Sequence, residues 1–454
     1  MKNTKITATF GPACESELMI EQLLKAGVDV FRFNFSHDTA EGQVERMNRV
    51  RKVSKALGLY VGVMLDTKGP EIRTHLFKGD KVTVMKGSTI SIHTDKEILG
   101  DANSFSVTYE GLFDDVEIGG QILVDDGYLQ LTVVAKSIET KVITAIAQNT
   151  HSIKNRRGIN VPNTVLKMPF ISTKDYNDIL VACDNDFDYI AASFTRRASD
   201  IRAIREILKE KGKPNIQIIA KIENQEAIDN LDEIIDETDG VMVARGDLGV
   251  EIPPEELPHL QKEMIRQSQR KGKFVIVATQ MLESMQENPR PTRAEVSDIA
   301  NAVYEAADST MLSGETAAGK YPIESVNYMN RVQTRTEDEV EYIGLIEEAF
   351  KYSKNDINEI LSFSAARSAL KGQVKGIVAY GVELAKTVSK YRPDVPILAF
   401  VDNYKEAAQL SVYYGVRPVL TKEELNKYFT KLYLKKGDII INLKDGKLDV
   451  HMEK

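Results

Sequence analysis

The sequence has few cysteines, no tryptophan and no long apolar run. Only two of its 454 residues are cysteines, Cys14 and Cys183, which are too few for a disulfide framework or a four-cysteine zinc site. The first residues, MKNTKITATFG, lack the apolar stretch of a signal peptide, and no later run is long enough to span a bilayer. We therefore expect a cytoplasmic protein of a reducing compartment, with no membrane partner.

An excess of positive charge is also missing. The chain has 59 Lys and Arg against 67 Asp and Glu, and its net charge of -8 argues against a nucleic-acid binder with a broad basic surface. Small anionic ligands remain possible because local clusters of charge can hold them. Hydrophobic residues at 42% and charged residues at 28% are typical of a globular protein, and the length predicts two or three domains.

Runs typical of buried strands alternate with amphipathic stretches along most of the chain. The helical stretches 16–27, 41–58 and 198–212 each end in glycine, as helices often do. Eight strand-like runs predict a (β/α)8 TIM barrel. These runs are residues 5–10, 28–36, 60–66, 187–194, 216–223, 240–247, 274–280 and 309–314.

Two other regions interrupt or follow this rhythm. Residues 74–163 alternate apolar with polar residues and carry a DDG turn, which predicts an inserted small β-barrel domain that acts as a lid. After the barrel, KGIVAY, PILAFV, VRPVL and DIIIN predict a C-terminal open α/β domain. We therefore expect a discontinuous catalytic barrel, 1–73 and 164–336, a lid, 74–163, and a C-terminal domain, 337–454.

The stretch IIAKIEN ends a predicted barrel strand on two opposite charges. Lys221 and Glu223 are two residues apart, so they share one face of the strand. A simple ion pair at the strand end explains this pattern equally well when it is taken alone. Other polar residues, however, also gather at the carboxyl ends of the strands, where active sites of such barrels are built. They include Arg32, Asn34, Ser36, Asp66, Thr67, Arg196, Arg197, Asp247, Thr279 and Gln280.

This set of residue types suggests chemistry on an anionic, phosphorylated substrate. Glu223 and Asp247 follow adjacent strands and offer two carboxylates to a hard cation such as Mg²⁺. Lys221 would add a second positive charge, and the amides of the ARGDLG turn would hold a carboxylate. The alternative for Asp247 is that its side chain caps the following helix.

Long ordered motifs resemble the pyruvate kinase family. They are FGPA, RFNFSH, LDTKGPEIRT, ILVDDG, AASFTRR, IIAKIEN, DGVMVARGDLGVEIP, ATQMLESM and PTRAEVSDIANAV followed by ADSTMLSGETAAGKYP. The resemblance is dense from residue 4 to about 330 and implies transfer of the phosphoryl group of phosphoenolpyruvate to ADP, in a homotetramer. It also implies Mg²⁺ (or Mn²⁺) and K⁺ as cofactors.

The resemblance assigns roles to individual residues. It implies catalytic roles for Lys221, Thr279 and Arg32, which also bind substrate together with Gly246 and Asp247. It places Mg²⁺ on Glu223 and Asp247. It places K⁺ on Asn34, Ser36, Asp66 and Thr67, and the nucleotide at Asn34, His37, Arg73 and Arg197.

Glu71 and the C-terminal domain predict how the activity depends on a cation and on an effector. Glu71 stands where potassium-dependent members of the family have glutamate and independent ones often have lysine, so we expect K⁺ dependence. The C-terminal stretch AYGVELAK, 379–386, lacks the serine and threonine hydroxyls with which many relatives bind a sugar phosphate, and the tail is short. We therefore expect weak or no activation by fructose 1,6-bisphosphate.

Two other functions remain as alternatives at this point. A barrel lyase acting on pyruvate or phosphoenolpyruvate would use a similar lysine, carboxylate and magnesium set, but it would not need Arg73, the lid or SFTRR for a nucleotide. A non-catalytic paralogue is favoured slightly by the altered C-terminal domain. The presence of every expected catalytic residue argues against it.

Overall fold

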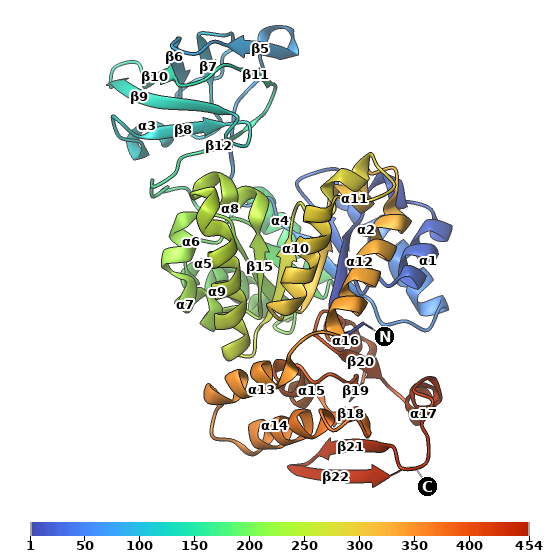
Figure 1. The fold of residues 1–454 in the computed structure, drawn as a ribbon. Helices are drawn as coiled ribbons and strands as arrows, with labels where there is room; N and C mark the ends of the chain where they lie inside the picture. Colours follow the sequence, from blue (N-terminus) through green and yellow to red (C-terminus); the bar gives the residue numbers. More distant parts are fainter. Residues whose placement is uncertain (1, 453–454) are drawn as a thin grey trace.

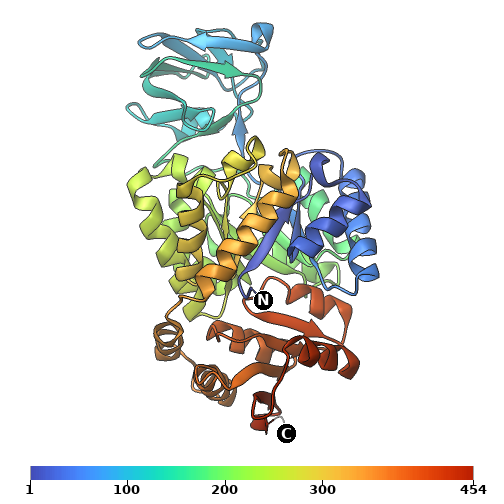
Figure 2. The same ribbon diagram turned by 45° about the vertical axis from the view of Figure 1, so that its right-hand side comes forward.

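Residues 2–452 are described in the computed structural model, which stacks three bodies along one axis (Figure 1). The barrel lies in the middle, the inserted sheet domain lies beyond one end of it, and the C-terminal domain packs against the other end. Figure 2 shows the same order after rotation, with the N-terminus close to the C-terminal domain. None of the helices in residues 2–452 combines the length and apolar character needed to cross a membrane.

Eight parallel strands close the barrel, as the sequence predicts. Their order around the barrel is β1-β17-β16-β15-β14-β13-β3-β2. The strands are β1 (Lys5–Thr9), β2 (Val30–Asn34), β3 (Gly62–Asp66), β13 (Tyr189–Ala192), β14 (Gln217–Ile222), β15 (Gly240–Ala244), β16 (Phe274–Ala278) and β17 (Ser309–Leu312). The helices around them are α1 (Glu17–Ala26), α2 (Ala40–Ala56), α4 (Thr173–Asp184), α5 (Ala198–Glu210), α6 (Gln225–Asp229), α7 (Leu231–Glu237), α8 (Arg245–Glu251), α9 (Leu257–Arg270), α10 (Arg293–Tyr304), α11 (Gly314–Ala317) and α12 (Pro322–Glu337).

The two-residue period of each strand divides its side chains between two cores. In β14, Ile218 and Ala220 belong to the core between the strands and the helices, whereas Ile219 belongs to the core inside the barrel. Lys221 and Glu223 continue the inward series toward the carboxyl end of the strand. The same alternation therefore gives the barrel an apolar interior below and a polar interior at its upper rim.

The C-terminal domain closes the lower end of the barrel. The Tyr189 hydroxyl donates to the carbonyl oxygens of Ala408, at 3.1 Å, and Gln409, at 2.8 Å. The rings of Phe274 and Tyr413 pack edge to face, with centroids 5.0 Å apart. Because the inner barrel core continues into the core of the C-terminal domain, solvent reaches the barrel interior from the lid side.

The inserted domain consists of short strands and one short helix. A seven-stranded sheet has the order β4-β12-β8-β9-β10-β6-β7, and β11 pairs separately with β5. The predicted DDG turn joins β8 to β9 in an antiparallel hairpin, and Asp125, Asp126 and Gly127 all have positive φ. The elements are β4 (Ile72–Arg73), β5 (Lys81–Val84), β6 (Thr89–His93), β7 (Ser104–Ser106), α3 (Leu112–Asp115), β8 (Gln121–Val124), β9 (Leu129–Ser137), β10 (Val142–Ala147), β11 (His151–Lys154) and β12 (Gly158–Asn160).

The C-terminal domain is an α/β sheet with strand order β20-β19-β18-β21-β22. The four predicted strands are present, and β22 adds an antiparallel edge strand that was not predicted. Its elements are α13 (Tyr342–Lys351), α14 (Ile357–Ala369), β18 (Val374–Tyr380), α15 (Val382–Lys390), β19 (Ile397–Phe400), α16 (Tyr404–Gln409), β20 (Val416–Val419), α17 (Lys422–Lys431), β21 (Ile439–Lys444) and β22 (Lys447–Met452). We propose domain boundaries near 73/74, 163/164 and 336/337; β4, just before the first of them, already pairs with the inserted sheet, and α12 ends one residue beyond the last.

Gly240 gives a test of how tightly the barrel interior is packed. A Cβ added there would lie 2.3 Å from a ring carbon of Phe274, so the ring would have to move. We expect Gly240→Ala to lower the free energy of unfolding, measured in urea, by about 1–3 kcal/mol. Gly344→Ala in α13 is the matched control, because no atom lies within 4 Å of the new Cβ. We expect that change to raise stability by about 0.5–1 kcal/mol; equal effects of the two changes would show that the interior is not close-packed.

Candidate active site

Lys221 lies at the centre of a buried polar cluster at the upper end of the barrel. Its Nζ lies 2.9 Å from Glu223 Oε1 and 3.2 Å from Asp66 Oδ1, and it donates to Ser193 Oγ at 2.7 Å. Burial alone would lower the pKa of Lys221, but the Asp66 and Glu223 carboxylates outweigh it and hold the pKa above its ordinary value. The cluster therefore keeps a permanent positive charge in a site that is almost closed to water.

Asp66 joins this cluster to the neighbouring strand. Arg32 on β2 donates from Nε to Asp66 Oδ2 and from Nη1 to Thr9 Oγ1, the latter at 3.1 Å. Burial would raise the pKa of Asp66, but the charges of Arg32 and Lys221 hold it below the ordinary value. Arg32 and Lys221 are therefore fixed on either side of one ionised carboxylate, and both cations belong to the same site.

Glu223 and Asp247 supply a second pair of carboxylates, Glu223 directly after β14 and Asp247 in the first turn of α8, which follows the adjacent strand β15. Burial raises the pKa of both side chains, Lys221 opposes this rise, and the charge of Asp247 raises the pKa of Glu223 further. A buried carboxylate and a half-buried one that repel each other fit a divalent cation. No group of three or more metal-ligating side chains occurs in residues 2–452, so such an ion would keep coordination places for water and substrate oxygens.

The alternative interpretation of Asp247 as a helix cap is wrong. Helix α8 begins at Arg245 with Ala244 at its N-cap position, and Asp247 lies within the first turn. No side-chain hydrogen bond caps this helix. The Asp247 carboxylate is therefore left to the site.

Thr279 directly follows the next barrel strand, β16, and lies in a strained turn. Thr279 and Gln280 have φ values of 69° and 55°, a conformation that residues other than glycine rarely adopt. The Thr279 hydroxyl accepts a hydrogen bond from the Gly246 amide at 2.7 Å. Arg245 donates to the Thr279 carbonyl at 2.6 Å and pairs with Asp298 at 2.6 Å, which holds the turn in place.

The four residues expected to bind a monovalent cation lie at the ends of β2 and β3. Asn34 pairs in register with Asp66, and Thr67 follows directly. The Asn34 side-chain oxygen accepts the Ser36 amide at 3.0 Å, while Ser193 donates its amide to Thr67 Oγ1 at 3.2 Å. The structure thus gathers these oxygens in one sector of the rim, with Asp66 shared between this sector and the Lys221 cluster.

Besides Asn34, the expected nucleotide-binding residues are His37 after β2, Arg73 on β4 of the inserted sheet and Arg197 after β13, and these three do not bond one another. His37 is exposed after β2, Arg73 pairs with Glu71 at 2.6 Å, and Arg197 pairs with Glu226. Within residues 2–452, no hydrogen bond or ion pair joins these three side chains. They surround the rim where the lid enters and leaves the barrel, since β4 pairs with β12 there.

A cavity of about 310 Å³ lies between the rim and the lid. It is lined by Glu71, Asp126, Phe194 and Asp247, among others. The lid reaches α8 directly: Asn160 Nδ2 donates to Glu251 Oε1 at 2.8 Å. The lid is therefore placed to cover Asp247.

Two site residues were not singled out from the sequence. Ser193 Oγ lies 2.9 Å from Asp66 Oδ1 and 2.7 Å from the Thr67 carbonyl oxygen, either of which can accept its one proton, and Thr9 accepts a hydrogen bond from Arg32. In both cases the two-residue period of the strand predicts a side chain on the inner face of the barrel. Ser193 is two residues after Ala191, which belongs to the core inside the barrel. Thr9 is two residues after Thr7, whose hydroxyl lies 2.9 Å from that of Ser309 on the adjacent strand β17.

Comparisons with known proteins agree with this geometry. The family model for the pyruvate kinase barrel domain matches residues 1–326, and that for the pyruvate kinase alpha/beta domain matches residues 359–448. The chain is 43% identical to a pyruvate kinase of Sporosarcina psychrophila over 97% of this chain and 77% of the relative, and 46% identical to one of Staphylococcus aureus over 93% of this chain and 72% of the relative. A crystal structure of a pyruvate kinase from Cryptosporidium parvum, 35% identical, superposes with a TM-score of 0.94 and covers 99% of this chain and 96% of that one. This chain belongs to the pyruvate kinase family.

Proposed function

We propose that the rim cluster around Lys221 transfers the phosphoryl group of phosphoenolpyruvate to ADP, giving pyruvate and ATP. The observation that carries this proposal is the convergence of Lys221, Glu223 and Asp66 in one buried ion cluster, with Asp247 in the helix that follows the adjacent strand. Phosphoryl transfer passes through a loose transition state, so fixed charge and positioning supply most of the catalysis. A buried cation held by carboxylates provides both.

Glu223 and Asp247 would hold Mg²⁺ (or Mn²⁺). When bound, the ion neutralises charge on phosphoryl and enolate oxygens. Lys221 approaches the same oxygens as a second positive charge, and Arg32 binds the phosphoryl group from β2. Because the Asp66 carboxylate holds both Lys221 and Arg32 in place, neither side chain has to reorganise during the transfer.

Gly246, Asp247 and Thr279 would bind the three-carbon part of the substrate. The Gly246 amide and the Thr279 hydroxyl bond each other at 2.7 Å in the free protein, and both would turn to substrate oxygens. The Thr279 hydroxyl is placed to pass a proton to the enolate that transfer leaves behind. The lid would exclude water, which would otherwise accept the phosphoryl group.

The remaining roles follow from the family. Asn34, Ser36, Asp66 and Thr67 would bind K⁺, and Asn34, His37, Arg73 and Arg197 would bind ADP. We propose a cytoplasmic homotetramer. Glu71, which pairs with Arg73, would place its negative charge beside the monovalent cation.

Removing the Lys221 charge tests the role of the cluster. In an assay of pyruvate formation from phosphoenolpyruvate with ADP, Mg²⁺ and K⁺, we expect Lys221→Met to lower kcat by about 10²–10³-fold, because a charge fixed for the transition state is lost. Lys390→Met is the matched control: it breaks a buried pair with Glu359, 2.8 Å in length, in the C-terminal domain. We expect the folded fraction of that variant to keep its kcat.

The same assay separates the alternatives. Pyruvate release without ADP would indicate a lyase or a phosphatase, and no release under any condition would indicate a non-catalytic paralogue. A Lys221→Met enzyme with more than a tenth of the wild-type kcat would remove the cluster from the mechanism.

Glu71 gives a test of the monovalent site. We expect activity to fall about tenfold or more when tetramethylammonium replaces K⁺, since the site then lacks about one unit of charge near the phosphates. Glu71→Lys should reduce this dependence, because its ammonium group stands in for the ion. Glu97→Lys, at an exposed position in the lid, is the control and should leave the dependence unchanged. Full activity of the wild-type enzyme in tetramethylammonium would contradict the proposal.

A further inference from the structure

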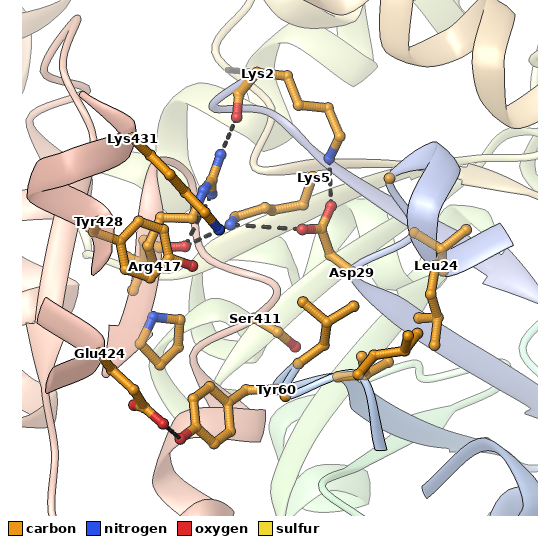
Figure 3. A pocket seen from close by; sticks show the side chains of 18 of the residues that line it. Lys2, Lys5, Leu24, Asp29, Tyr60, Ser411, Arg417, Glu424, Tyr428 and Lys431 are labelled. Atoms are coloured by element: carbon orange, nitrogen blue, oxygen red, sulfur yellow. Dashed lines mark hydrogen bonds and ion pairs between the residues drawn. The ribbon is translucent and has the colours of Figure 1, made fainter. Parts of the chain in front are cut away.

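A second cavity, of about 560 Å³, lies at the opposite end of the barrel from the active site. One wall comes from Lys2 and the start of β1, the segment before β2 and the segment before β3; the other comes from β20 and α17 of the C-terminal domain. Figure 3 shows Lys5 and Asp29 extending into it from the barrel side, and Lys431 and Tyr428 from α17 on the facing side. The cavity therefore spans the junction between two domains.

Positive charge dominates the lining. The five cationic side chains are Lys2, Lys5, Arg417, Lys427 and Lys431, against two carboxylates, Asp29 and Glu424. This is a local reversal of the chain's net charge of -8. Such a concentration of cations in a concave site favours an anionic ligand.

The two carboxylates are already occupied. Asp29 pairs with Lys2, lies 3.7 Å from Lys5, and accepts the Ile6 amide at 2.9 Å. Glu424 accepts the Tyr60 hydroxyl at 2.8 Å and the Leu420 amide at 2.7 Å. Neither is therefore available to neutralise the cations of α17.

Lys427 and Lys431 line the cavity without a carboxylate partner among residues 2–452. They lie four residues apart on α17, so they share one face of the helix, and Lys431 Nζ lies over the Tyr428 ring at 5.1 Å. Neither forms an ion pair with a carboxylate in the described part of the chain. Two like charges held this close repel each other, and a bound anion would relieve the repulsion.

The positive charges of Lys2 and Lys5, on the barrel wall, are also destabilised by their surroundings. Burial holds the pKa of Lys2 below, and that of Lys5 well below, the ordinary value; Arg417 lowers both, while Asp29 and Glu337 raise both. Lys5 is 2% exposed and donates to the Val416 carbonyl at 2.6 Å. An added negative charge would favour the protonated form of these amines.

We propose that this cavity binds a small organic phosphate, with the phosphate group between α17 and the Lys5 wall. The apolar part of the lining, which includes Leu24, Tyr60, Pro418 and Tyr428, would contact the carbon skeleton. The volume falls within the range of small-molecule sites, about 300–1,000 Å³. The site is separate from the stretch 379–386, none of whose residues lines the cavity, and it goes beyond the proposed catalytic function.

Calorimetric titration of the intact protein with glycerol 2-phosphate and with inorganic phosphate, without substrates or Mg²⁺, tests this proposal. We expect the double variant Lys427→Ala/Lys431→Ala to weaken binding of glycerol 2-phosphate at least tenfold. Both lysines are exposed on the helix surface, so the variant should fold. The matched control is Lys422→Ala, which removes an exposed lysine at the start of the same helix outside the cavity and should change the affinity less than twofold.

Three results would overturn the proposal. They are the absence of saturable binding, an unchanged affinity in the double variant, which would place the phosphate in the active site, and tighter binding of succinate than of either phosphate, which would assign the cavity to carboxylates. Because no turnover is needed, the test is independent of whether the catalytic proposal holds.

Discussion

The active site depends on one buried ion cluster. Lys221 lies between the carboxylates of Asp66 and Glu223, and Arg32 holds the far side of Asp66. Taking these charges out of water costs several kcal/mol per ion, so the cluster contributes little to stability and is better explained by the catalytic role that we propose for it. The barrel supplies what such a cluster needs: strand ends that fix each side chain and a lid that limits the access of water.

The rest of the fold can be related to this constraint. An inward polar layer at the upper rim requires an apolar layer beneath it, and the inner barrel core continues into the C-terminal domain, where the Phe274 ring packs on Tyr413. The strained turn at Thr279 persists because Arg245 bonds its carbonyl and Asp298 fixes Arg245. Strain at the rim is therefore balanced by contacts outside the reacting centre.

Much of this arrangement was predictable from the sequence. Parallel barrel strands are buried on both faces, so their apolar runs are strong signals, and the two-residue period placed Lys221 and Glu223 together. The edge strand β22 was missed although Asp445 and Gly446, both with positive φ, mark a hairpin turn, because half-exposed strands have weak apolar patterns. Ser193 was missed as a site residue because a serine after a strand is usually a loop residue; the strand period placed it on the inward side, and its contact with Lys221 shows that it belongs to the site. The cavity at the domain junction brings residues 2–5 to residues 416–431, a proximity that no local pattern contains.

The most direct measurement follows the binding of Mg²⁺ to the substrate-free protein across pH by calorimetry. Glu223 and Asp247 have raised pKa values, so above the ordinary carboxyl pKa the folded protein holds protons that the unfolded chain has lost, and its metal-free stability falls as pH rises through this window. Mg²⁺ must displace these protons, so its affinity should rise with pH over the same window and binding should release protons. Glu223→Gln should weaken Mg²⁺ binding and reduce this dependence, because only Asp247 then titrates at the site, whereas Glu305→Gln, which alters a carboxyl group with a raised pKa that bonds Gln261 at 2.7 Å outside the site, should retain both. An affinity independent of pH, or one unchanged by Glu223→Gln, would show that the carboxylate pair does not hold the ion.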